Sequence, residues 1–61
     1  MPATTRETTR DGFDCVMAPE GREWVCSLYR SGGQIPLCRK MVDDEVKAEK
    51  WFTNAIARES K

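Results

Sequence analysis

The amino-acid sequence predicts an α+β fold in which a three-stranded antiparallel sheet packs on one C-terminal helix, in the order βββα. Three observations predict it. Short runs of alternating apolar and polar residues occupy the middle of the chain, turn-forming Pro and Gly separate them, and an apolar stripe with helical spacing follows. We expect a flexible N-terminal arm over residues 1–11 and a single domain over residues 12–61.

The composition is that of a small soluble domain. Of the 61 residues, 39% are hydrophobic and 33% are charged, which is typical of one modest core. Ten Lys and Arg residues balance ten Asp and Glu residues, whereas a non-specific nucleic-acid binder usually has a clear basic excess. No stretch approaches the roughly 18 apolar residues of a membrane span, and no apolar signal segment opens the chain. We therefore expect a cytoplasmic protein that does not enter a membrane.

The first ten residues are rich in Thr and Arg and, apart from Met1, contain no large apolar side chain. Such a segment cannot bury enough apolar surface to become ordered, so we expect a flexible tail. The alternative is a short basic arm that follows a phosphate backbone through Arg6 and Arg10.

Two strands are expected in the middle of the chain, over residues 13–18 and 24–30. Successive side chains of a strand point to opposite faces, so the apolar residues of both strands share one face. These residues are Phe13, Cys15, Met17, Trp24, Cys26 and Leu28. A Pro-Glu-Gly-Arg turn joins the two strands and a Ser-Gly-Gly turn follows the second.

A third strand is expected over residues 34–40, with Ile35 and Leu37 on the inner face. Pro36 has no amide hydrogen to donate, so this strand should lie at an edge of the sheet. A helix then begins near Asp43, whose carboxylate complements the positive N-terminal end. Apolar residues recur along this helix at the spacing of one face. They are Ala48, Trp51, Phe52, Ala55 and Ile56.

The helix should cover the apolar face of the sheet, so the opposite, open face is where we look for a function. The residues expected on it are Asp14, Val16, Val25, Ser27, Tyr29, Gln34, Pro36, Cys38 and Lys40. The candidate partner-binding side chains are Val25, Ser27, Tyr29 and Gln34. The candidate basic residues at the rim are Arg22, Arg30, Arg39 and Lys40. An exposed aromatic such as Tyr29 is typical of protein interfaces, whereas a basic rim around hydrogen-bonding side chains suits DNA.

No catalytic or metal-binding pattern stands out. The chain contains no His for acid–base chemistry near neutral pH. No two of the three cysteines have the CxxC spacing of a metal-ligand pair, and a structural zinc site needs four ligands. The cysteines are Cys15, Cys26 and Cys38. Their odd number argues against a complete disulfide framework, so we expect buried or half-buried thiols, with one disulfide or a metal site as the alternatives. We predict no enzymatic activity and no cofactor.

One series of segments resembles the integrase arm-type and AP2-like DNA-binding domains. It comprises residues 23–30, then a Ser-Gly-Gly-Gln turn, an Ile-Pro-Leu run and a helix with an acidic start. The resemblance covers residues 13–56. It implies a three-stranded sheet that enters the major groove of duplex DNA. In that arrangement Ser27, Tyr29 and Gln34 would read bases, and the basic rim residues would hold phosphates.

Two classes of function stay open. The first is a DNA-binding module or accessory protein of a mobile element, whose affinity would depend strongly on salt. The second is a protein-binding module, such as a phage- or plasmid-type inhibitor or adaptor, that uses an apolar sheet face or an edge strand. A homodimer that buries the open face is a variant of the second. The assignment of faces depends on strand register, because a shift by one residue inverts it.

Overall fold

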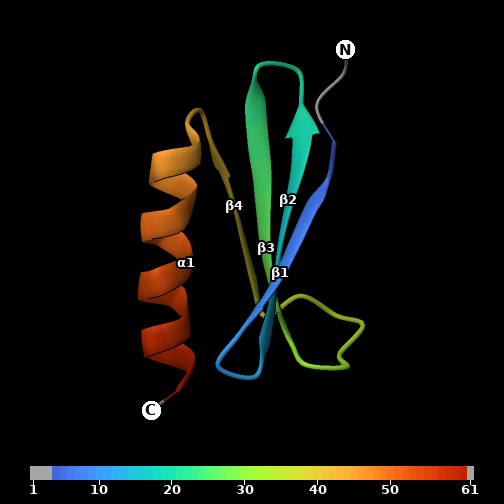
Figure 1. The fold of residues 1–61 in the computed structure, drawn as a ribbon, viewed down its shortest axis with the longest axis vertical. Coiled ribbons are helices and arrows are strands. Elements are labelled where there is room, and N and C mark those ends of the chain that lie inside the picture. Colours follow the sequence, from blue (N-terminus) through green and yellow to red (C-terminus); the bar gives the residue numbers. More distant parts are fainter. Residues whose placement is uncertain (1–3, 61) are drawn as a thin grey trace.

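The computed structural model describes residues 4–60, which form a four-stranded antiparallel sheet followed by one helix (Figure 1). The strands are β1 (Arg6–Arg10), β2 (Phe13–Glu20), β3 (Glu23–Arg30) and β4 (Cys38–Val42), and the helix is α1 (Glu45–Glu59). Strands that are neighbours in the sequence are neighbours in the sheet, so β1 and β4 are its two edges. The predicted α+β class and C-terminal helix are confirmed, but the sheet has one strand more than expected.

The additional strand is β1, which lies in the segment expected to be a flexible arm. It pairs antiparallel with β2 through a tight turn at Asp11 and Gly12. Both turn residues have positive φ, 49° and 83°, as a type I′ hairpin turn requires, and Gly adopts such a φ without steric cost. The expectation of a flexible arm is therefore wrong for β1 and its turn, while residues 1–3 lie outside the described residues.

The two central strands, β2 and β3, have the inner faces that the sequence pattern predicts, but Pro19 and Glu20, which were expected in the turn, continue β2. A two-residue turn with Gly21 at its first position joins them, and each apolar residue of β2 lies opposite a residue of β3 on the same face. Trp24 is half-buried at the margin of the core. The other predicted inner residues are confirmed as buried, namely Phe13, Cys15, Met17, Cys26 and Leu28.

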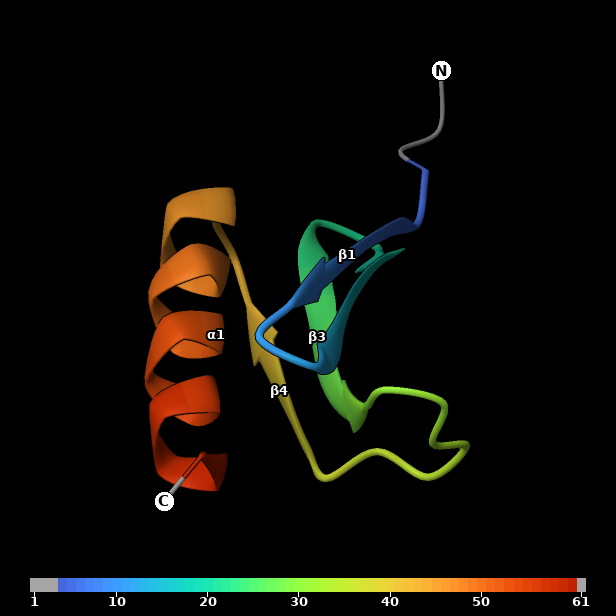
Figure 2. The same cartoon turned by 60° about the horizontal axis from the view of Figure 1, so that its bottom comes forward.

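The predicted third strand over residues 34–40 is displaced, because β4 begins only at Cys38. Ile35 is 81% exposed and Leu37 is 38% exposed, so the expectation that they line the core is wrong. They lie with Pro36 in a loop between β3 and β4, which extends away from α1 (Figure 2). Pro36 lacks the amide hydrogen that a strand ladder uses, which favours the loop.

The displacement also inverts the two faces of β4. Directly paired residues share a face, and Lys40 lies opposite the buried Cys26 while Cys38 lies opposite Leu28. Cys38 and Lys40 therefore lie on the helix side, and their expected place on the open face is wrong. The register follows the buried Val42, because shifting it by one residue would move this side chain out of the core.

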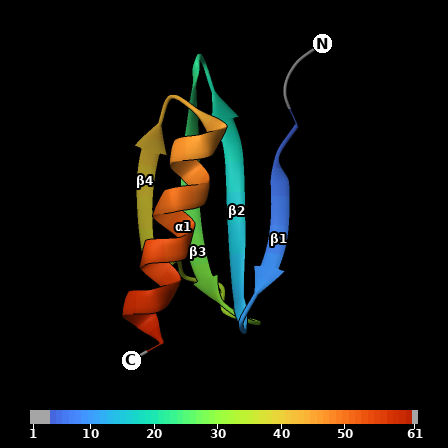
Figure 3. The ribbon, with the colours of Figure 1, turned by 60° about the vertical axis from the view of Figure 1, so that its left-hand side comes forward.

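The helix packs across the sheet on the side of β2, β3 and β4 (Figure 3). It begins at Glu45, two residues after the expected start, and the Asp44 carboxylate accepts a hydrogen bond from the Val46 amide at 2.8 Å. The predicted apolar stripe is confirmed, with Trp51 only half-buried and the rest buried. The buried members are Ala48, Phe52, Ala55 and Ile56.

Candidate functional site

The open face of the sheet contains three of the predicted partner-binding residues, on β3. Val25 and Tyr29 are half-buried there, but Ser27 is only 7% exposed. The Ser27 hydroxyl is therefore largely inaccessible for a hydrogen bond to a partner. Gln34 lies in the loop rather than in a strand, and with Tyr29 it lines a shallow hollow of about 400 Å³. The structure thus brings Tyr29 and Gln34 together and leaves Ser27 covered.

The charge of the open face is acidic. By register, the carboxylates on this face belong to Glu7, Asp14, Glu20 and Glu23. Among the described residues, the guanidinium of Arg39 is the basic group on the strands of this face. Carboxylates repel a phosphate backbone, so the electrostatics of this face suit a protein surface better than DNA.

The predicted basic rim is dispersed. Arg22 lies in the turn between β2 and β3, while Arg30 lies at the opposite end of β3 with its guanidinium 5.6 Å from the centre of the Phe13 ring. Arg39 is on the open face of β4 and Lys40 is on the helix side. These four residues therefore do not form one cluster that could track a single phosphate backbone.

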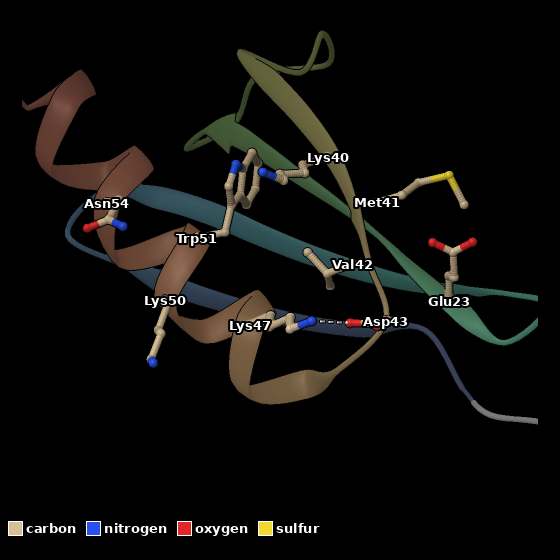
Figure 4. A pocket seen from close by; sticks show the side chains of 9 residues that line it. All are labelled: Glu23, Lys40, Met41, Val42, Asp43, Lys47, Lys50, Trp51 and Asn54. Carbon is tan, nitrogen blue, oxygen red and sulfur yellow. Dashed lines mark ion pairs between the residues drawn. The ribbon is translucent and has the colours of Figure 1, made fainter.

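A groove of about 530 Å³ runs between β4 and α1 (Figure 4). Its lining residues come from the start of β3, from β4, from the connection between β4 and α1, and from α1. They are Glu23, Lys40, Met41, Val42, Asp43, Lys47, Lys50, Trp51 and Asn54. Lys40 is the one predicted site residue in the groove. The rest were missed because a helix pattern predicts which residues are buried, but not which strand lies beside the helix.

The lysines of the groove differ in their partners. The Lys47 ammonium lies 2.9 Å from an Asp43 carboxylate oxygen, four residues away. The hydrogen bond between them lowers the pKa of Asp43 and raises the pKa of Lys47. Among the described residues, Lys40 and Lys50 form no such ion pair. Their charges are therefore available to a ligand of opposite sign.

The backbone of β4 presents unpaired groups at the edge of the sheet. The residue pair that flanks a two-residue hairpin turn is hydrogen-bonded, and bonded and non-bonded pairs then alternate along the strands. Odd-numbered residues of β3 therefore bond to β2, and even-numbered ones bond to β4. It follows that Cys38, Lys40 and Val42 bond inward. The N–H and C=O groups of Arg39 and Met41 point outward, along the groove.

The three thiols are the remaining candidate reactive groups. Cys15, Cys26 and Cys38 are free thiols, and burial raises the pKa of each, so they stay protonated near neutral pH. Over residues 4–60, no three Cys, Asp or Glu side chains are grouped as metal ligands. Within the same residues, no helix has the length and apolar character to cross a membrane.

The chain matches no family model, no curated protein and no solved structure. The resemblance to integrase arm-type and AP2-like domains therefore stays a prediction. The described residues form a small α+β domain with an acidic open face and a basic groove beside β4, which pairs with β3 on one side only.

Proposed function

We propose that this protein is a non-enzymatic protein-binding module that accepts an extended segment of a partner as a fifth strand on β4. The observation that carries the proposal is that β4, an edge strand of the sheet, lies beside the groove along α1; by the alternation of the ladder, the N–H and C=O groups of Arg39 and Met41 point outward at this edge. In such strand addition, hydrogen bonds to the main chain supply affinity, and pockets for alternate side chains supply specificity. The groove is such a pocket.

Apolar side chains flank the edge on both sides. Met41 is 49% exposed on the open side of β4, and Trp51 is half-buried on the helix side. An added strand would cover Met41 with one set of alternate side chains and Trp51 with the other set. Met and Trp are enriched in protein interfaces, because they bury large and adaptable surfaces.

The other edge strand, β1, lacks these features. Its residues are all polar or charged, and two of them are bound to the helix. Arg6 lies 3.0 Å from Glu45, and Arg10 donates a hydrogen bond to Glu49. Among the described residues, β1 offers a partner no apolar side chain of its own, and its Glu7 lines only the shallow hollow of the open face, so β4 is the favoured site.

Duplex DNA on the open face, the first function predicted from the sequence, has less support. The carboxylates on that face repel phosphates, and Ser27 is too deeply placed to read a base. The proposal therefore takes the second predicted class of function, binding at an edge strand.

The test blocks one outward amide of β4 while leaving every side chain in place. Ligation at Cys38 joins a synthetic segment 38–61, with an N-methyl group on Met41, to segment 1–37. Random twelve-residue peptides displayed on phage are selected on the unmodified protein, and the selected peptides are measured against both forms by NMR titration. We expect about tenfold weaker binding to the methylated protein, because the methyl group removes one hydrogen bond and blocks close approach.

One control accompanies this test. A protein with an N-methyl group on Thr9, whose amide points outward on β1 by the same alternation, has the matched change at the other edge and should bind as the unmodified protein does. Equal affinity for the Met41-methylated and unmodified proteins would overturn the proposal.

A further inference from the structure

The groove beside β4 has an excess of positive charge. Its charged lining residues are Lys40, Lys47, Lys50, Glu23 and Asp43. The one ion pair among them joins Asp43 to Lys47, as far as the described residues show. Arg39 adds a further positive charge on the open side of the same strand. A strand added at this edge would therefore pass between basic side chains on both of its faces.

The same charges oppose pairing of β4 with a second copy of itself. A symmetric β4–β4 contact would bring the Arg39 and Lys40 side chains of both copies together near the two-fold axis. Like charges opposite one another destabilise a pair of strands, and basic residues on an edge are a common protection against self-association. The occupant that suits this edge is thus a different chain with negative charge.

The register of a fifth strand determines where its charges would lie. A residue directly opposite Lys40 would share its face and place its side chain in the groove. The neighbouring residue, opposite Arg39, would place its side chain on the open face, because side chains alternate. The residue opposite Met41 would meet an exposed apolar side chain. A complementary strand therefore has two consecutive acidic residues next to an apolar one.

We infer that the occupant of the β4 edge is an extended acidic segment of another protein, in which two consecutive Asp or Glu residues meet Arg39 and Lys40. The inference rests on the proposed function and adds the chemical class of the partner. Charge complementarity of this kind selects among partners more than it adds affinity.

The test uses three synthetic ten-residue peptides that alternate Thr and Val except for a central pair, which is Glu-Glu, Gln-Gln or Lys-Lys. Each is titrated into ¹⁵N-labelled protein, and the Arg39 and Met41 amides report binding at the edge. We expect the Glu-Glu peptide to bind on the order of fivefold more tightly for each charge contact than the Gln-Gln peptide.

A double variant, Arg39→Glu with Lys40→Glu, should reverse the order and prefer the Lys-Lys peptide. The double variant Arg22→Glu with Arg30→Glu makes the same change of charge at two positions that do not line the groove, and it should leave the order unchanged.

The outcomes separate the inference from the proposed function. Equal binding of the Glu-Glu and Gln-Gln peptides at the two amides would overturn the acidic partner and leave the edge site standing. If none of the peptides, including those selected on phage, shifts these amides, the proposed function fails as well.

A ten-nucleotide oligothymidylate is titrated in parallel. If it shifts the Lys47, Lys50 and Trp51 signals at a lower concentration than the Glu-Glu peptide does, the groove is a nucleic-acid site and the inference is wrong.

Discussion

Cysteine is a core residue in this domain. Cys26 is 0% exposed and lies in register between Met17 on β2 and Lys40 on β4, with α1 packed on the same side of the sheet. Burial raises its pKa, so the thiol remains neutral and behaves as a small apolar group. The sequence expectation of buried or half-buried thiols is confirmed: Cys15 and Cys26 are buried, and Cys38 is half-buried at the edge of the core.

At this scale, we predict that Cys26→Ser lowers the free energy of unfolding by about 1–3 kcal/mol, because a hydroxyl is buried where the thiol had apolar neighbours. Cys38→Ser is the matched control, and its half-buried position should make the loss smaller. Urea unfolding followed by tryptophan fluorescence measures both. An equal loss in the two variants would show that Cys26 is not in a closed apolar environment.

At the scale of elements, the sequence contained a signal for β1 that composition concealed. Asp-Gly between two extended runs is a strong indicator of a two-residue hairpin, and it lies between Arg10 and Phe13. Thr also favours strands. The segment resembled a disordered tail because it has no apolar face of its own. It becomes ordered by pairing with β2 and by its ion pairs to the helix.

The start of the helix is a second feature at this scale. We predict that Asp44→Ala destabilises the protein by about 1 kcal/mol, because the carboxylate that accepts the Val46 amide hydrogen bond is lost. Asp43→Ala removes only an exposed ion pair with Lys47, so it should destabilise the protein less. Thermal unfolding by circular dichroism compares the two variants, and a larger effect of Asp43→Ala would contradict the assignment of the cap.

At the scale of the whole molecule, a net charge of zero conceals a separation of charge. Carboxylates gather on the open face, lysines gather in the groove, and the cations of β1 pair with the acidic side of α1. A domain of this size buries only about 60% of its unfolded surface, so peripheral contacts matter for the order of its edges. The ion pairs join β1, which lies outside the main sheet–helix contact, to the helix.

We predict that Glu49→Gln loosens β1 and leaves the rest of the sheet intact. The amides of Thr8 and Arg10, which bond to β2 by the alternation of the ladder, should exchange with deuterium up to about fivefold faster, the range expected for an exposed ion pair. Amides of β3 should be unaffected. Glu20→Gln is the control, and faster exchange in that variant would show that the effect is not specific to the contact with Arg10.

The sequence by itself determined the fold class, the inner faces of β2 and β3, and the apolar stripe of α1, because periods of two and of 3.6 residues are local properties of a chain. Only the tertiary structure decided that residues 6–10 form a strand and that β4 begins at Cys38. It also decided that Lys40 lies beside the helix and that β4 has a free edge along a groove. Each of these depends on which residue lies opposite which, and a pairing between distant segments leaves no period in the sequence.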